Sequence, residues 1–193
     1  MTSILTARFE DALVFTAQLH AQQYRKGSQS QIPYIAHLLS VSALVIEAGG
    51  DEDLAIAALL HDSVEDQGGL ETLVKIRQRF GNRVADIVDS CSDSYTMPKP
   101  AWKTRKENYL DKLQTSSQEV RLVSLADKLH NARNTLRDLR KENEMVWDKF
   151  NGGKTGTLWY YRSLIEIFEQ FEAIFLLDEL KRVVNQIEIF AQS

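Results

Sequence analysis

The stretch AIAALLHDSVEDQGG, residues 55–69, joins an apolar run to a cluster of ionisable side chains. Its first six residues are small or aliphatic, which is typical of a helix buried in a core. His61, Asp62, Glu65 and Asp66 then follow, and a glycine pair closes the segment. So much charge directly behind a buried helix predicts that these groups bind an ion or do chemistry at the helix end.

The periodicity around this stretch is helical along the whole chain. Apolar residues recur at three- and four-residue steps, as at Phe9, Leu13 and Ala17, and strict alternation over a strand length is hard to find. We therefore predict an all-α fold. The expected helices cover residues 5–26, 38–49, 51–62, 70–80, 82–94, 102–115, 117–140 and 156–191, the last broken once.

The breaks between these helices are too short to be domain linkers. The chain has 193 residues, of which 44% are hydrophobic and 26% are charged, as in an ordinary globular protein. No internal repeat and no glycine-rich phosphate loop is found. We expect one compact multi-helix domain over residues 1–193.

Charge and composition exclude several classes of partner. A net charge of −4 without a basic stripe argues against binding to nucleic acid or to an anionic membrane. No apolar run approaches the roughly 18 residues of a spanning helix, and the N-terminus lacks a basic leader. The single cysteine, Cys91, fits a reducing compartment. We expect a cytoplasmic protein with a small-molecule partner, and a homo-oligomer is left open.

Histidine and acidic residues are the candidates for chemistry. An imidazole and a carboxylate that straddle a helix end, such as His61 and Asp62, are ordinary ligands for Mn²⁺, Fe²⁺ or Zn²⁺. Two ligands do not make a durable site, and His37 in PYIAH and Asp127 in SLADKLHN are candidates for the others. Each has an alternative: His37 as a core or capping residue, and Asp127 as a buried salt-bridge partner. Their combination favours a metal site.

This order of residues resembles that of the HD-domain metal-dependent phosphohydrolases, and within them the hydrolase domain of the Rel/Spo alarmone enzymes. The narrower resemblance rests on RKG at 25–27, PYIAH at 33–37, AALLHDSVED at 57–66, FG at 80–81, TRKEN at 104–108 and LADKLHNAR at 125–133. It covers about residues 8–135, and residues from about 140 to 193 are expected to form a closing helical layer. The chain leaves no room for synthetase and regulatory domains, so the resemblance implies a small stand-alone alarmone hydrolase.

The resemblance also implies a reaction and the residues that carry it. One divalent metal ion, usually Mn²⁺ in the family, would be bound by His37, His61, Asp62 and Asp127. Glu65 and Asp66, about one turn further on, would form the acid/base pair. The implied reaction is hydrolysis of the 3′-pyrophosphate of a (p)ppGpp-type alarmone, with guanine or adenine as base, to the 5′-di- or triphosphate nucleotide and pyrophosphate. A metal ion makes such a reaction feasible near neutral pH.

Substrate contacts follow from the same resemblance. The implied residues are Arg25, Lys26, Tyr34, Lys128 and Asn131. Arg25 and Lys26 match a basic pair that meets the nucleotide, although basic residues after a helix are also common complements of its dipole. Asn131 is four residues after Asp127 and shares its helix face. Lys128 can equally be a solvated charge.

Other residues are expected to have packing roles or to differ from the family. His20 and His130 are interpreted as structural. Leu38 stands where the family usually has a proline after the first ligand, so the contacts to the base are in doubt. Trp102 could stack on a purine or pack against the protein, and packing is favoured.

Two other functions are left open. The first is an HD-type nucleotidase or phosphatase that acts on another nucleotide, and the RKG, PYIAH and TRKEN motifs argue against it. The second is a catalytically silent module that senses a nucleotide. The presence of both Glu65 and Asp66 argues against a silent protein.

Overall fold

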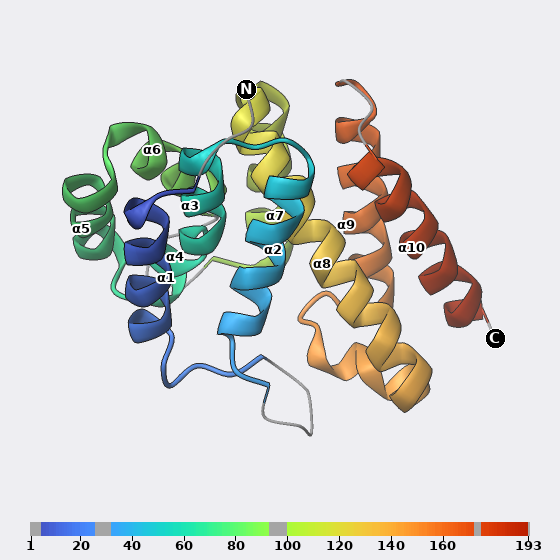
Figure 1. The fold of residues 1–193 in the computed structure, drawn as a ribbon. Helices are drawn as coiled ribbons and strands as arrows, with labels where there is room; N and C mark the ends of the chain where they lie inside the picture. Colours follow the sequence, from blue (N-terminus) through green and yellow to red (C-terminus); the bar gives the residue numbers. More distant parts are fainter. Residues whose placement is uncertain (1–4, 26–31, 93–99, 172–174, 193) are drawn as a thin grey trace.

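The computed structural model describes residues 5–25, 32–92, 100–171 and 175–192. In these ranges the regular structure is helical, and one isolated antiparallel bridge joins Tyr24 to Pro33. The elements are α1 (Ala7–Leu19), α2 (Ile35–Glu47), α3 (Glu52–Leu60), α4 (Ser63–Asp66), α5 (Gly69–Phe80), α6 (Asn82–Cys91), α7 (Trp102–Thr115), α8 (Gln118–Glu142), the 3₁₀ helix η1 (Asn143–Lys149), α9 (Gly153–Phe168) and α10 (Phe175–Gln192) (Figure 1). The prediction of an all-α fold is confirmed.

Helix α3 lies in the core because it has no polar side after its first turn. Every residue from Leu54 to Leu60 is buried. The helix packs against α1, α2 and α6, which surround it in Figure 1. A helix that is apolar all round is stable only when other elements cover it. The buried run therefore carries its charged C-terminal end, His61 and Asp62, into the interior.

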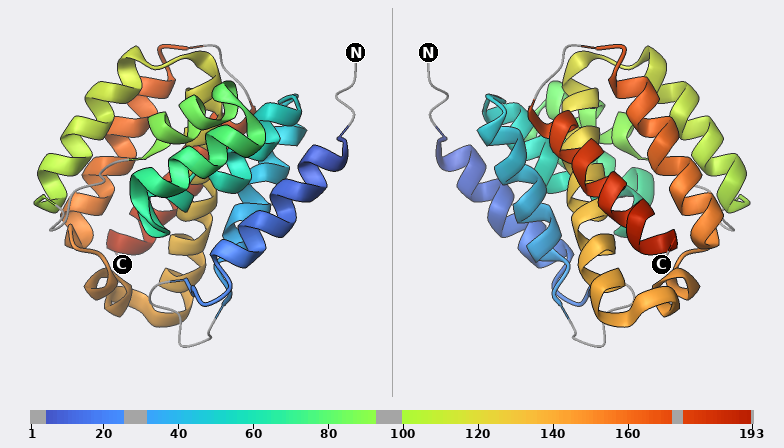
Figure 2. Two further views of the ribbon diagram at one scale, coloured as in Figure 1. Left: turned by 90° about the vertical axis from the view of Figure 1, so that its left-hand side faces the viewer. Right: turned by 90° about the vertical axis from the view of Figure 1, so that its right-hand side faces the viewer.

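Helix α8 connects the two sides of the molecule. It packs against α2, α3 and α6 on one side and against α10 on the other (Figures 1 and 2). Its interior face is apolar except for a few polar residues, among them Asp127. No helix in the described ranges is both long and apolar enough to cross a membrane.

Side-chain caps explain where several helices begin. The Asp51 carboxylate accepts a hydrogen bond from the Leu54 N–H at 3.0 Å, at the start of α3. The Ser117 hydroxyl does the same for the Val120 N–H at 3.3 Å, at the start of α8. These bonds satisfy donors that have no partner inside the helix. Gly81, with φ of +94°, separates α5 from α6 in a conformation that favours glycine.

The predicted boundaries of the first two helices were wrong. Helix α1 ends at Leu19 and not near residue 26, because the following segment makes backbone bonds to the residues before α2. The Arg25 N–H donates to the Ile32 carbonyl and the Tyr34 N–H to the Gln23 carbonyl, both at 2.9 Å. Helix α2 starts three residues earlier than predicted, which places His37 in its first turn. The 3₁₀ helix η1 was not predicted.

Substitution of Leu180 by alanine is expected to destabilise the whole domain. Leu180 is fully buried in α10, the helix that covers α8. The lost burial and the cavity should lower the free energy of unfolding by about 2–5 kcal/mol, measured by urea denaturation with circular dichroism. Leu70→Ala, at a 62% exposed position, is the control and should change it by less than about 0.5 kcal/mol. An unchanged midpoint in Leu180→Ala would mean that α10 does not unfold with the rest.

Candidate functional site

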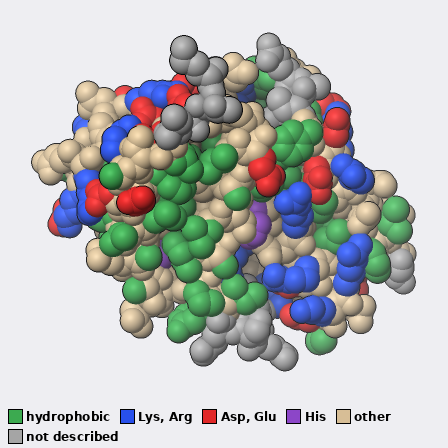
Figure 3. Space-filling model, in the orientation of Figure 1, with side chains coloured by type: hydrophobic (Ala, Val, Ile, Leu, Met, Phe, Trp, Pro, Cys, Tyr) green, Lys and Arg blue, Asp and Glu red, His purple; other side chains and the backbone are tan. Residues whose placement is uncertain are grey.

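The candidate site lies where α2, the junction of α3 and α4, and the middle of α8 meet. His37 is in the first turn of α2, and Asp127 is on α8. His61 directly follows α3 and Asp62 directly precedes α4, so the two side chains straddle a helix end as the sequence indicated. Histidine atoms reach the surface beside a group of Lys and Arg side chains in Figure 3.

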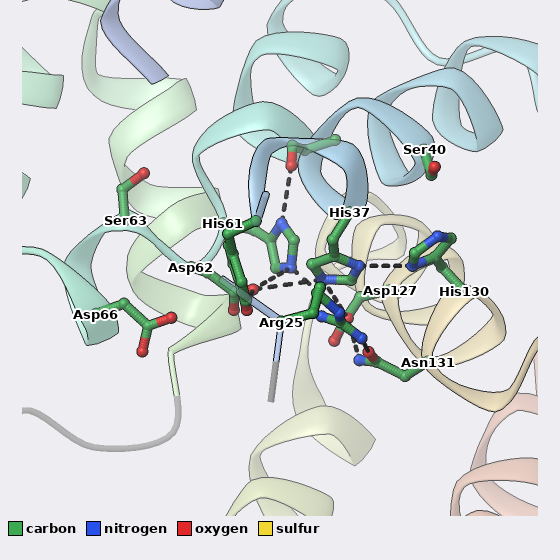
Figure 4. Close-up of polar contacts among 12 residues, drawn as sticks. Arg25, His37, Ser40, His61, Asp62, Ser63, Asp66, Asp127, His130 and Asn131 are labelled. Atoms are coloured by element: carbon green, nitrogen blue, oxygen red, sulfur yellow. Dashed lines mark hydrogen bonds and ion pairs between the residues drawn. The ribbon is translucent and has the colours of Figure 1, made fainter. Parts of the chain in front are cut away.

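Four of the predicted residues converge on a small volume, shown in Figure 4. His37 Nε2 lies 3.4 Å from Asp62 Oδ2 and 3.2 Å from Asp127 Oδ1. His61 Nε2 lies 3.1 Å from Asp62 Oδ2 and 3.7 Å from Asp127 Oδ1. One ligand atom each from His37, His61 and Asp127 lies within 4.8 Å of the others. The four side chains therefore point at one another from three segments of the chain.

The burial of these groups distinguishes the site from a surface cluster. His37, His61 and Asp127 are only 1%, 3% and 5% exposed. The Nε2 atoms of both histidines are buried without a hydrogen-bond partner. Buried polar atoms normally have partners, and two imidazole nitrogens that face two carboxylates form the nitrogen–oxygen set of a transition-metal site. The donor set thus fits a divalent metal ion.

Neighbouring groups orient both imidazole rings. His61 Nδ1 donates to the Ala58 carbonyl at 2.8 Å, which leaves Nε2 for the cluster. His37 Nδ1 lies 2.7 Å from His130 Nδ1, so one of these nitrogens donates to the other. Bonds to the outer nitrogen of a ligating histidine keep its ring in position. His130, interpreted as structural, therefore contacts the site directly.

The two carboxylates are held in the same way. Asp127 Oδ1 accepts from Asn131 Nδ2, and its Oδ2 pairs with Lys128 Nζ, both at 2.5 Å. The Tyr34 hydroxyl donates to Asp62 Oδ2 at 2.6 Å. These bonds leave each carboxylate with oxygen lone pairs directed at the histidines.

Electrostatics keep the cluster charged in the absence of a cation. Burial alone would raise the pKa of Asp62 and Asp127, but the charge of His61 on Asp62 and of Lys128 on Asp127 holds both pKa values well below the ordinary range. Burial also disfavours the His61 imidazolium, yet the two carboxylates outweigh it and raise the pKa of His61. Burial lowers the pKa of His130 to about 3, so that ring is neutral. Two ionised carboxylates in the interior suit a cation site.

Three of the predicted substrate residues lie together beside this cluster. Arg25 Nη2 donates to Asn131 Oδ1 at 2.7 Å. The Arg25 guanidinium also lies 5.4 Å from the centre of the Tyr34 ring. Lys128 contacts the cluster through its pair with Asp127; its side chain is 14% exposed, and its ammonium also lies 4.8 Å from the Tyr109 ring. Lys26 lies outside the described residues.

The predicted acid/base residues are on the short helix α4. Glu65 is partly buried and Asp66 is exposed. Asp66 Oδ2 accepts a hydrogen bond from Gln23 Nε2 at 2.7 Å. Sequence reasoning missed Gln23, since a glutamine in a loop carries no signal of a contact that spans 43 residues.

Residues expected to pack do so. Trp102 fits against Gly152, where an added Cβ would come within 2.6 Å of the indole ring. Its ring centre lies 6.2 Å from that of Trp159. His20, interpreted as structural, is 2% exposed, and Leu38, which stands where the family usually has a proline, is fully buried. The packing interpretation of Trp102 therefore agrees with the structure.

A divalent cation is expected to stabilise the fold through this cluster. An ion that binds only the folded state adds about 2.7 kcal/mol at 100 times its dissociation constant, which corresponds to a rise in Tm of roughly 5–10 °C for a chain of this size. Thermal unfolding of EDTA-treated protein, with and without Mn²⁺, measures the effect. The absence of any shift with Mn²⁺, Fe²⁺ or Zn²⁺ would contradict the metal site.

Comparisons with known proteins match this chain to the HD domain and to ppGpp pyrophosphohydrolases. A family model described as "HD domain" matches residues 12–158. The guanosine-3′,5′-bis(diphosphate) 3′-pyrophosphohydrolase MESH1 of Xenopus tropicalis is 39% identical over 141 residues, which are 72% of this chain and 73% of the relative. The human protein of the same name is 36% identical over 145 residues, 74% of this chain and 75% of its own.

A solved structure is similar over nearly the whole chain. It is described as a metazoan ortholog of SpoT that hydrolyses ppGpp and plays a role in starvation responses. Its TM-score is 0.77 at 27% sequence identity, with 96% of this chain and 98% of that chain covered. The similarity therefore includes helices beyond the family model.

Proposed function

Because this chain belongs to the HD-domain family, we propose that it is a metal-dependent enzyme that hydrolyses the 3′-pyrophosphate of a (p)ppGpp-type alarmone. The products would be the 5′-di- or triphosphate nucleotide and pyrophosphate. The observation that carries the proposal is the pair of buried histidine Nε2 atoms that face two carboxylates. Relatives and a structural neighbour named for ppGpp hydrolysis support the substrate class.

We propose that the metal ion is Mn²⁺, held by His37, His61, Asp62 and Asp127. The mixed set of two imidazoles and two carboxylates suits this ion, which accepts both oxygen and nitrogen ligands. When bound, such a cation activates water and offsets negative charge on a phosphoryl group. The outer bonds from Tyr34 to Asp62 and from Asn131 to Asp127 support these assignments by orienting the carboxylates.

Glu65 and Asp66 are the proposed acid and base. Helix α4 begins directly after Asp62, and the Asp66 N–H donates to the Asp62 carbonyl at 3.0 Å, so the acids lie within one turn of the cluster. One carboxylate would accept the proton of the water that attacks the phosphorus on the 3′ oxygen. As the bond from that phosphorus to the 3′ oxygen breaks, a proton is delivered to the oxygen, so the nucleotide leaves with a 3′ hydroxyl and the attacked group becomes pyrophosphate.

The proposed substrate contacts are Arg25, Tyr34 and Asn131, with Lys26 added from the sequence. A guanidinium matches the geometry of phosphate oxygens, and Arg25 is already held by Asn131 next to the cluster. Lys128 was also predicted to contact substrate. Its pairing with Asp127 favours a role in neutralising that buried carboxylate.

The proposed setting is the cytoplasm, where the lone cysteine, Cys91, would remain reduced. We also propose that residues 1–193 form one HD-type domain, with the helices from η1 onward as a closing layer. The unfolding of Leu180→Ala tests this organisation.

A substrate panel tests the proposed activity. The Mn²⁺-loaded protein is incubated separately with ppGpp, ppApp, nucleoside mono- and triphosphates and NADPH, and products are separated by ion exchange. Pyrophosphate from either alarmone, with the other nucleotides intact, is the expected result and identifies the base. Inorganic phosphate from a monophosphate or NADPH, with both alarmones intact, would indicate a broader HD-type phosphatase. Bound metal without any turnover would indicate a silent nucleotide sensor.

A further inference from the structure

A chain of hydrogen bonds connects the end of α1 to the proposed acid/base residue Asp66. His20 Nε2 lies 3.1 Å from the Ser63 hydroxyl, and His20 Nδ1 lies 2.6 Å from Gln23 Oε1. Gln23 Nε2 donates to Asp66 Oδ2 at 2.7 Å. Gln67 Nε2 donates to Gln23 Oε1 at 2.6 Å. Two residues that follow α1 are thus bonded to three residues on or next to α4.

The direction of each bond follows from the groups involved. The Gln23 nitrogen donates to Asp66, so the Gln23 oxygen must face His20 and Gln67. That oxygen accepts from both, so the proton of His20 is on Nδ1. His20 Nε2 then accepts from the Ser63 hydroxyl. All donors therefore point toward Asp66, with Ser63 as the first and the Gln23 amide as the last.

The hydrogen-bonded series begins at buried residues and ends at an exposed one. Ser63 is fully buried and His20 is 2% exposed, whereas Asp66 is exposed. Burial also lowers the pKa of His20, in agreement with a neutral ring. An exposed aspartate at the end of a four-residue helix would otherwise adopt several rotamers. The hydrogen bond from the Gln23 amide favours the orientation that Asp66 has here.

His20 is also connected to the four-residue ligand cluster, through Tyr34. The His20 ring stacks on Tyr34, with centres 5.5 Å apart and planes inclined by 17°. The Tyr34 hydroxyl donates to Asp62 Oδ2 at 2.6 Å. His20 therefore lies between the residues that hold Asp62 and those that hold Asp66.

We propose that Gln23, supported by His20, is a positioning residue that orients the Asp66 carboxylate relative to the proposed metal site during hydrolysis. The inference rests on the proposed function and adds two residues to its machinery. Neither residue touches the substrate: they act through Asp66. Small errors in the placement of a catalytic group are enough to lower a rate by about 100-fold.

The test is a double-mutant cycle with Gln23→Leu and Asp66→Asn. Leucine keeps the approximate size of glutamine but cannot donate to a carboxylate. Single-turnover release of pyrophosphate, KM, Mn²⁺ affinity and Tm are measured for each variant. Gln22→Leu, the same change at an exposed neighbour, is the matched control.

Gln23→Leu is expected to lower kcat by about 10–100-fold, with KM and Mn²⁺ affinity changed by less than about 2-fold. In the Asp66→Asn background, the same substitution should change kcat by less than about 2-fold, because the group that it positions is already lost. Gln22→Leu should match the wild type.

Two results would overturn the inference while the proposed function stands. One is full activity of the Gln23→Leu variant when the wild-type protein does release pyrophosphate. The other is an equal loss of kcat from Gln23→Leu in both backgrounds, which would mean that Gln23 acts independently of Asp66. A wild type with no turnover of either alarmone would instead overturn the proposed function, and the inference with it.

Discussion

Replacement of Asp62 by alanine is expected to remove bound metal and activity together. Asp62 Oδ2 faces the Nε2 atoms of His37 and His61 at 3.4 and 3.1 Å. Without this carboxylate, three ligands remain and the two imidazoles lose a counter-charge. Loss of a supporting group around a metal ion already costs about 10–100-fold in affinity, so loss of a ligand should exceed that range. Turnover should fall to that of the EDTA-treated enzyme.

Metal content after dialysis, measured by mass spectrometry, and pyrophosphate release at saturating alarmone check this prediction. Asp62 suits the experiment because its side chain is 23% exposed, so its removal leaves less buried charge unpaired than removal of Asp127 would. Asp86→Ala, on an exposed face of α6, is the matched control. An Asp62→Ala protein that keeps its metal would remove Asp62 from the ligand set.

Replacement of Glu65 by glutamine is expected to separate metal binding from catalysis. Glutamine keeps the shape of the side chain but cannot accept or deliver the proton that the reaction moves. Positioned acid or base groups contribute about 10²–10⁴-fold to rate, and kcat should fall by this amount. Metal affinity should change by less than about 2-fold, since Glu65 follows the ligand pair without joining it.

Isothermal titration with Mn²⁺ and single-turnover kinetics measure the two effects. Glu71→Gln, at an exposed position on α5, is the matched control and should behave as the wild type. A Glu65→Gln protein with wild-type kcat would leave Asp66 as the acid/base group, and a protein that loses metal would make Glu65 a ligand.

The all-α class could be predicted from local sequence, and the gathering of the four ligand candidates from the family resemblance. A run such as AIAALL is apolar on every side and must be buried, so the charged pair His61 and Asp62 had to be at the end of a core helix. The motifs around His37 and Asp127 then indicated which distant residues join that pair. The roles of these residues remain predictions until the variants are measured.

Other features depend on contacts that no local pattern reports. Helix α1 ends early because backbone bonds join residues 23 and 25 to residues 34 and 32. Lys128 looks like an ordinary solvated charge on α8, yet it points inward and pairs with Asp127. Gln23 reaches Asp66 over 43 residues. Such pairings follow from how the helices pack, and helical periodicity is the same whichever partner is present.

Hydrolysis in H₂¹⁸O tests the central claim most directly. The Mn²⁺-loaded protein is given ppGpp in labelled water, and mass spectrometry follows the products. The account predicts GDP and pyrophosphate in equal amounts, with one ¹⁸O in the pyrophosphate and none in the GDP, because water attacks the phosphorus and the 3′ oxygen leaves with the nucleoside. Label in the GDP, release of inorganic phosphate in place of pyrophosphate, or unchanged ppGpp would contradict it.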